Sequence, residues 1–199
     1  MLCGGLITVT VSVSTGNIAD MSLLKNVAGQ NVTFGLINVS TDAPLTGLGS
    51  SVTINISKDG GAQATGAGTI TELGHGAYNY APTQSETNAN CVSFLLTPTS
   101  AIPENLMFLT GGLHKNVANQ HVTFVMFSQS GVADTGATVS VFTTKDGGAQ
   151  AAGGGTVTNL GLGQYDYLPT QAETNGTNVS FLFTATSDVI QNVSIFTVP

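Results

Sequence analysis

Two acidic side chains, Glu86 and Glu173, are the first candidates for chemistry, because a buried carboxyl group can act as a general acid. Each lies three residues after a threonine, in segments 83–86 (TQSE) and 170–173 (TQAE). In this capping-box spacing the carboxylate accepts a hydrogen bond from the threonine N–H, and the threonine hydroxyl accepts one from the glutamate N–H. We predict a cap on a single helical turn at each site. Glycosidase carboxyls must face each other across roughly 5 to 9 Å, whereas these two occupy equivalent sites of separate domains.

The histidines and cysteines have no metal-binding or catalytic spacing. His75, His114 and His121 form no His-Glu-x-x-His or paired-histidine motif, and we expect them to be solvated loop or strand-edge residues. Cys3 and Cys91 are too few for a disulfide framework, and Gly-x-Ser-x-Gly is absent. We therefore predict no catalytic residue, no metal site, no cofactor and no enzymatic activity.

The composition disfavours two classes of partner. Only 8% of the 199 residues are charged, the net charge is -7 and all four cations are lysines, so little is available to neutralise nucleic-acid phosphates. The longest apolar stretches are far below the roughly 20 residues that cross a bilayer, and the N-terminus lacks the basic region of a signal peptide. We expect neither a nucleic-acid nor a membrane partner.

An internal repeat organises the chain. Segment 25–34 matches 115–124, and segment 78–88 matches 165–175. Equivalent positions therefore differ by 90 residues in the first part of the repeat and by 87 in the rest. The predicted boundaries are 1–20 for an N-terminal arm, 21–110 for the first repeat and 111–199 for the second.

Alternating apolar residues predict β-strands throughout both repeats. Val32, Phe34 and Leu36 share one face of a strand, and their counterparts recur in the second copy. Segment 58–61 (KDGG), repeated at 145–148, predicts a tight reverse turn with its paired glycines at positive φ. Six or seven short strands per repeat predict an all-β chain of two tandem immunoglobulin-like antiparallel β-sandwich domains.

Four tyrosines are candidates for ligand contact: Tyr78, Tyr80, Tyr165 and Tyr167. Each pair lies on one face of a predicted strand, where the rings can cover the sandwich core while the hydroxyls find water or backbone partners. In the alternative interpretation the rings are exposed and stack on glycans.

Several short motifs resemble the small immunoglobulin-like modules of tailed-bacteriophage virion proteins. The resemblance covers most of residues 24–199. It rests on Ser57-Lys58-Asp59-Gly60-Gly61, Leu73-Gly74-x-Gly76-x-Tyr78, Thr83-x-x-Glu86-Thr87-Asn88 and Val92-x-Phe94, with the same signature returning between Val139 and Phe181. Such modules occur on head decoration proteins, head fibres, necks, tail tubes, baseplates and tail fibres. The resemblance implies a virion structural protein, assembled in the host cytoplasm, whose partners are other virion proteins and copies of itself.

Within that class we expect a decoration or fibre subunit on the head or neck, because the whole sequence consists of a leader and two modules. A tail or baseplate component is the next interpretation. A carbohydrate-binding adhesin that contacts host-surface glycans is the alternative from another class. A nearly charge-free surface has little to steer a charged substrate, but it allows close protein packing.

The leader contains a predicted assembly strand. Its alternating apolar residues are Ile7, Val9, Val11 and Val13. No strand of this length precedes the second repeat, and an unpaired β-branched strand would be an aggregation hazard. It therefore needs a sheet edge, either in its own first domain or, by strand addition, in a neighbouring subunit. We favour the neighbouring subunit.

Overall fold

The structure, a computed structural model, describes residues 23–98 and 100–199. The predicted arm over residues 1–20, with its strand at Ile7, Val9, Val11 and Val13, lies outside the described residues. Those residues contain β-strands and one short 3-10 turn, η1 (Gly49–Ser51), so the predicted all-β class is confirmed.

The first repeat contributes two antiparallel sheets. Its strands are β1 (Val32–Gly35), β2 (Ile54–Lys58), β3 (Ala64–Thr65), β4 (Thr69–Gly74), β5 (Ala77–Ala81), β6 (Cys91–Leu96) and β7 (Glu104–Leu109). One sheet has the order β1-β5-β4 and the other the order β3-β2-β6-β7. Some neighbouring strands in a sheet are therefore far apart in the sequence, such as β1 and β5 or β2 and β6.

The second repeat builds the same pair of sheets. Its strands are β8 (Leu113–His114), β9 (Val122–Val125), β10 (Ser140–Lys145), β11 (Ala151–Ala152), β12 (Thr156–Gly161), β13 (Gln164–Leu168), β14 (Asn178–Thr184) and β15 (Gln191–Val198). The sheet orders are β12-β13-β9 and β11-β10-β14-β15-β8, in which β8 pairs parallel with the end of β15. Within the described ranges each sheet takes its strands from one repeat.

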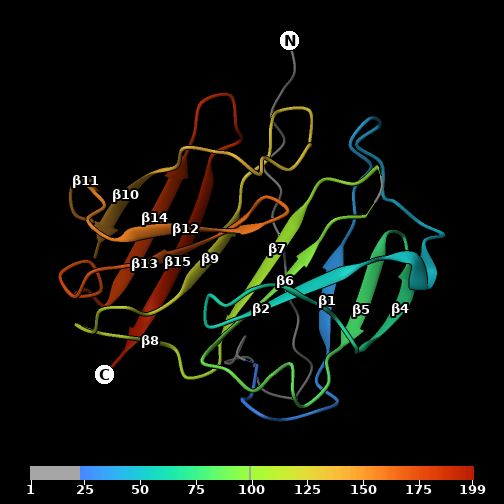
Figure 1. Cartoon of the computed structure of the whole chain (residues 1–199), viewed down its shortest axis with the longest axis horizontal. Coiled ribbons are helices and arrows are strands. Elements are labelled where there is room, and N and C mark those ends of the chain that lie inside the picture. Colours follow the sequence, from blue (N-terminus) through green and yellow to red (C-terminus); the bar gives the residue numbers. More distant parts are fainter. Residues whose placement is uncertain (1–22, 99) are drawn as a thin grey trace.

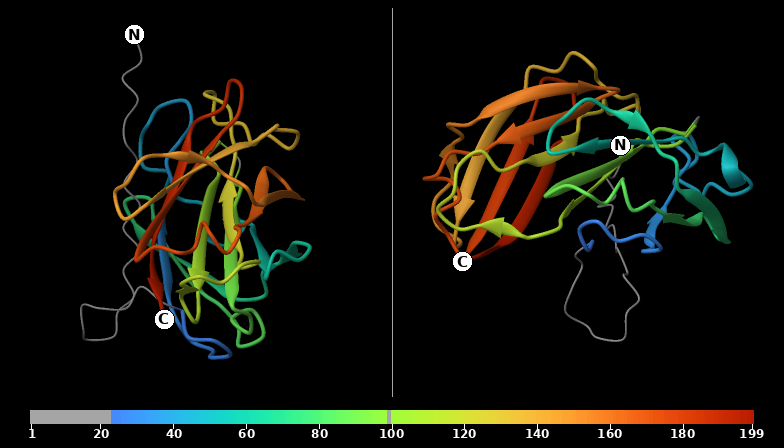
Figure 2. Two further views of the ribbon diagram at one scale, coloured as in Figure 1. Left: turned by 90° about the vertical axis from the view of Figure 1, so that its left-hand side faces the viewer. Right: turned by 60° about the horizontal axis from the view of Figure 1, so that its bottom comes forward.

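The sheets follow one another along the long axis of the molecule. Strands β4, β5 and β1 lie at one end, β2, β6 and β7 in the middle, and β10, β14 and β15 at the other end (Figure 1), with β9 between β7 and β15. The right-hand view in Figure 2 shows the same succession. Each repeat has an apolar core, and Met107 and Leu109 of β7 also pack against the core of the second repeat.

The two cores share their aromatic geometry. Tyr80 and Phe94 meet edge to face with ring centroids 5.6 Å apart, and Tyr167 and Phe181 do so at the same distance. The predicted inward positions of the first repeat are buried: Val32, Phe34, Leu36, Val52, Ile54, Ile56, Val92, Phe94 and Leu96. Period-2 alternation therefore identified the core faces correctly.

The turn at segment 58–61 differs in one detail from the sequence-based expectation. Asp59 and Gly60 take the positive φ values, 48° and 65°, instead of the two glycines. The Gly61 N–H donates to the Lys58 carbonyl at 2.9 Å, which closes a hairpin turn of the type that needs positive φ at both central residues. Aspartate tolerates this region better than most residues, and the Asp59 carboxylate accepts hydrogen bonds from the N–H groups of Asn90 and Cys91.

The core packing of the second repeat yields a prediction. Replacing fully buried Phe181 by alanine should lower the free energy of unfolding by about 3 to 5 kcal/mol, because it removes an aromatic side chain from a closed core. Chemical denaturation measures this difference. The matched control is Phe196→Ala, since Phe196 is 74% exposed and its loss should change stability by less than about 0.5 kcal/mol. Equal effects would contradict the assigned core.

Candidate functional site

The glutamates of the two Thr-x-x-Glu segments are buried structural groups. One carboxylate oxygen of Glu86 accepts a hydrogen bond from the Thr83 N–H at 2.6 Å, and Glu173 repeats this contact with Thr170 at 2.6 Å. The Thr87 N–H donates to the Thr83 carbonyl, and the Thr174 N–H donates to the Thr170 carbonyl, so each segment forms a single turn. The carboxylate half of the predicted capping box is confirmed.

The hydroxyl half of that motif is wrong. The Thr83 hydroxyl pairs with the Ser85 hydroxyl at 3.2 Å, and the Thr170 hydroxyl donates to the Glu173 carboxylate at 2.7 Å. The Glu173 N–H donates instead to the Thr170 carbonyl. In the second repeat the Thr170 carbonyl therefore accepts the hydrogen bond that the motif assigns to the threonine hydroxyl.

The second carboxylate oxygen of each glutamate ties the turn to the rest of the repeat. In Glu86 it accepts from the Tyr80 hydroxyl at 2.9 Å and from the Ala67 N–H at 2.6 Å. In Glu173 it accepts from the Tyr167 hydroxyl at 2.5 Å and the Gly154 N–H at 3.0 Å. Each carboxylate thus links three separate segments of its repeat.

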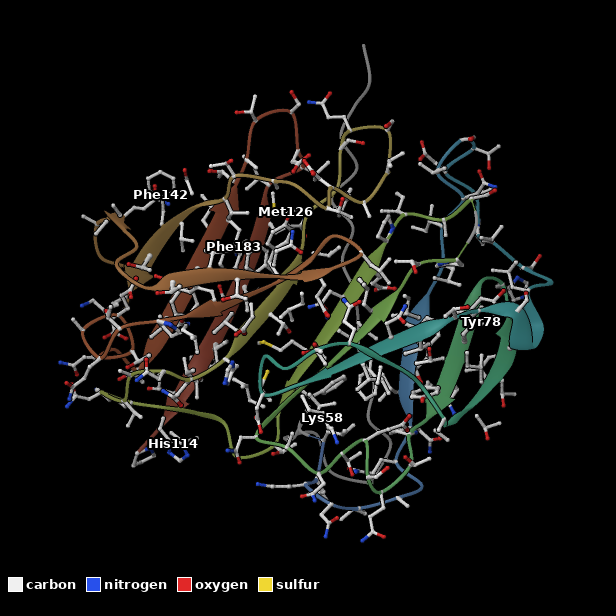
Figure 3. The ribbon with its side chains drawn as sticks, in the orientation of Figure 1. Lys58, Tyr78, His114, Met126, Phe142 and Phe183 are labelled. Atoms are coloured by element: carbon white, nitrogen blue, oxygen red, sulfur yellow. The ribbon has the colours of Figure 1, made fainter. Side chains whose placement is uncertain are left out.

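All four tyrosines point into the cores, so the glycan interpretation is wrong for them. Tyr78, Tyr80, Tyr165 and Tyr167 are between 0% and 2% exposed, and Figure 3 labels Tyr78 among the side chains of the first repeat. The Tyr78 hydroxyl donates to the Leu45 carbonyl, and the Tyr165 hydroxyl donates to the Asp134 carbonyl. Alternation along β5 and β13 places both rings of a pair on the inner face, where no sugar can stack on them.

The hydrogen bonds to Glu86 change its pKa. Burial alone would raise the pKa of this carboxyl, but the bonds from Ala67, Thr83 and Tyr80 outweigh burial and hold the pKa below its usual value of 4.5. At Glu173 the hydrogen bonds likewise outweigh burial and hold the pKa of the carboxyl below 4.5. The ionised carboxylates therefore stabilise the fold above pH 4.5, and this contribution is lost as the pH falls through the lowered pKa.

These bonds predict the effect of Glu86→Gln. At pH 7 the variant should lose about 1 to 3 kcal/mol of unfolding free energy, because buried donors lose a charged acceptor. The difference from the natural chain should shrink below pH 4.5, where the carboxylate becomes protonated. Urea denaturation at both pH values measures it, with Gln84→Ala on the exposed side of the same turn as the control. A pH-independent difference would rule out the proposed charge effect.

His121 and Asp166 form a polar pair that single-residue reasoning missed. His121 Nδ1 lies 2.8 Å from a carboxylate oxygen of Asp166, which is buried. In the first repeat the equivalent residues are Asn31 and Asn79, whose side chains hydrogen-bond at 2.8 Å. His121 lies directly before β9 with 24% of its side chain exposed, so it is a strand-edge residue as expected, but its contact with Asp166 was not expected. His75 and His114 are exposed, and His114 lies at the rim in Figure 3.

This pair belongs to the contact between the two repeats, which we call the seam. In the seam, the outer face of β6 and β7 packs on the outer face of β9 and β13. A Cβ atom on Gly60, in the hairpin turn of the first repeat, would clash with the side chains of Asp166 and His121. The turn therefore rests directly on the pair.

Gln164 is the central polar residue of the seam. Its side chain is fully buried, and its amide nitrogen donates to the Ser93 hydroxyl at 2.9 Å and to the Asn105 side-chain oxygen at 2.6 Å. Its amide oxygen accepts from Gln63 at 2.8 Å. One glutamine side chain thus uses both its donor and its acceptor to connect β13 to three positions of the first repeat.

Burial confirms where the repeats touch. All six residues of β6 are buried, whereas its counterpart β14 alternates between buried and half-buried residues. All four residues of β9 are buried, whereas β1 alternates. A small apolar cluster of Leu95, Ile102, Val125 and Phe127 completes the contact. The seam therefore covers the outer face of one sheet from each repeat.

A groove of about 720 Å³ runs beside the seam, lined by residues of β7, β9 and β15 and by Gly35 and Ile37. In the described part of the chain β7 pairs only with β6, and β15 pairs with β14 and, at Thr197 and Val198, with β8. Residues 104–109 and 191–196 thus present to the groove strand edges that pair with no further strand among the described residues. Such edges accept an additional strand.

Glu104 lies in this groove with one carboxylate oxygen buried and without a hydrogen-bond partner among the described residues. Burial raises the pKa of its carboxyl from 4.5 to about 7. The charged form is therefore unfavourable in the folded protein, and stability should fall as the pH rises from 4.5 to 7.

The orphaned carboxylate predicts a stabilising substitution. Glu104→Gln should raise the free energy of unfolding at pH 8 by up to about 3 kcal/mol, the equivalent of this pKa difference, and should change little at pH 4. The expected change in the free energy of unfolding has the opposite sign to that of Glu86→Gln, so urea denaturation of both variants over one series of pH values compares them. A variant less stable than the natural chain at pH 8 would show that the charge has a partner.

The described residues offer little for chemistry beyond these contacts. They contain no group of three His, Cys, Asp or Glu side chains that could hold a metal ion. Burial raises the pKa of the Cys91 thiol far above its usual range, which makes it unreactive. No helix within residues 23–98 and 100–199 has the length and hydropathy to span a membrane.

Comparison with known proteins identifies no family. No protein-family model matches the chain, and no curated protein matches it. The arrangement is therefore interpreted from its own geometry: a polar seam, a groove and the strand edges of β7 and β15 beside it.

Proposed function

We propose that the chain is a non-enzymatic bacteriophage virion structural protein, a decoration or fibre subunit on the head or neck. It is assembled in the host cytoplasm and contacts other virion proteins and copies of itself. The observation that carries the proposal is the pair of open edges on β7 and β15 beside the groove. Edges of this kind serve strand addition between chains, whereas the titratable groups described above serve the fold.

We also propose that both repeats are immunoglobulin-like. The order β3-β2-β6-β7 opposite β1-β5-β4 corresponds to the C′-C-F-G and B-E-D sheets of that fold. The second repeat supports the same correspondence with β11-β10-β14-β15 opposite β12-β13-β9. This topology agrees with the resemblance to phage modules that the sequence motifs indicate.

In this proposal the leader is the strand that one chain gives to another. Its apolar residues Ile7, Val9, Val11 and Val13 alternate over seven positions, a length similar to the six-residue edge of β7. Backbone hydrogen bonds would supply affinity, and the alternating side chains would supply register.

Deletion of residues 1–15 tests the function. Purified full-length protein should bind to virions that lack it, and cryo-EM should show it on the head or neck. The deletion variant should stay folded by circular dichroism and lose at least about tenfold in binding, because one strand of backbone hydrogen bonds is missing.

Removal of residues 1–5 alone is the control, since it keeps the alternating segment and should leave binding unchanged. Binding of the full-length protein to host glycans but not to particles would overturn the proposal in favour of an adhesin. Equal particle binding by the 1–15 deletion would show that the leader is not the docking strand.

A further inference from the structure

The two repeats leave different faces uncovered. The seam covers the outer face of β6 and β7 in the first repeat, but the equivalent face on β10, β14 and β15 has no covering element among the described residues. We call this the free large-sheet face. It carries Phe142, Ser180, Leu182, Asn192, Ser194 and Phe196, and Figure 3 shows Phe142 on the side away from the first repeat.

At the other end of the molecule the opposite kind of face is uncovered. The seam covers the outer face of β9 and β13, but the equivalent face on β1 and β5 is only partly buried. We call this the free small-sheet face, and it carries Thr33, Gly35, Ala77 and Asn79. One molecule therefore exposes the same two kinds of face that it joins in its middle. Gly35 of one face and Asn192, Ser194 and Phe196 of the other also line the groove beside the seam.

Several seam contacts have their equivalents ready on these faces. Ser180 donates to Asn192 at 2.8 Å on the free large-sheet face, and these residues match Ser93 and Asn105. Nothing lies within 4 Å of a Cβ atom on Gly147, whereas its counterpart Gly60 rests on the other repeat. The hydrogen-bonded Asn31 and Asn79 on the free small-sheet face occupy the places of His121 and Asp166.

The apolar part of the seam is also reproduced. Leu182 and Val189 on the second repeat match Leu95 and Ile102, and Ile37 on the first repeat matches Phe127. Phe196 is 74% exposed and stands where the first repeat has Leu109. An exposed aromatic side chain on an uncovered sheet face is typical of a protein contact.

We propose that copies of this chain associate head to tail, with the free small-sheet face of one copy docked on the free large-sheet face of the next. The contact repeats the seam between chains, so the two surfaces differ and every copy leaves one of each uncovered. Such heterologous contacts extend without closing when the rotation between copies does not close a ring. The inference rests on the proposed role in virion assembly and deepens it by naming the surfaces through which copies meet.

The contact between copies is weaker than the seam within the chain. Ala77 stands where the seam has Gln164, and Gly35 stands where it has Val125. The contact therefore lacks the three hydrogen bonds of the glutamine and part of the apolar cluster. It forms at high local concentration, such as that of neighbouring subunits held on one particle.

This deficit gives a gain-of-function test. The double variant Gly35→Val with Ala77→Gln restores the seam residues on the first repeat, and a Cβ atom on Gly35 would meet nothing within 4 Å. Sedimentation velocity of the full chain over a concentration series should show association at concentrations at least about tenfold lower than for the natural chain. Adding Leu182→Glu should abolish that association, because it places a charge in the apolar part of the contact.

The matched control is Ala172→Gln, a glutamine added at an exposed alanine outside both faces, which should leave association unchanged. Circular dichroism and urea denaturation establish that each variant is folded. Unchanged association of the folded double variant would overturn the inference, and so would association that survives Leu182→Glu. Absence of the chain from virions, with the concentration-dependent association intact, would instead overturn the proposed function alone.

Discussion

The buried amide of Gln164 is the interaction on which the arrangement of the whole molecule depends. Each repeat closes a core between two sheets, and the apolar contacts between the repeats, such as Met107 and Leu109 against the second core, are not directional. Gln164 supplies the directional contact because its donor and acceptor both need partners once it is buried. Ser93, Asn105 and Gln63 meet this need together in one relative position of the repeats.

Comparison of the two copies separates residues that make the fold from residues that make the seam. The capping glutamates, the core tyrosines and the Lys-Asp-Gly-Gly turns are the same in both copies, and they make the same contacts. Gln164, Val125 and Met107 differ from their counterparts Ala77, Gly35 and Ser194. These differences lie on outer sheet faces, where the fold of one repeat constrains residue identity little. They therefore mark the residues that make the contact between the repeats.

The fold was largely predictable from the sequence, because its signals are local. Alternation places Phe34 and Phe94 inward, and three-residue spacing brings Glu86 to the Thr83 backbone. The choice between core and ligand contact for Tyr78 and Tyr80 needed the structure, since alternation shows that two residues share a face but not which face is inner. The seam was not predictable, because Gln164 and its partner Ser93 are 71 residues apart and each looks like an ordinary polar residue of a strand.

The asymmetry of the seam also affects how the chain reaches its folded state. The β12–β13 and β4–β5 hairpins have similar sequences and the same inward tyrosines, and exchange between such repeated segments during folding is a characteristic hazard of tandem repeats. After an exchange, Ala77 and Asn79 would lie against Ser93 and Asn105. These two side chains would then be buried without the hydrogen bonds that the Gln164 amide donates to them. The exchanged form would lose these hydrogen bonds at the moment the repeats dock. The contact that orients the repeats therefore also selects, among near-identical strands, those that belong to each half.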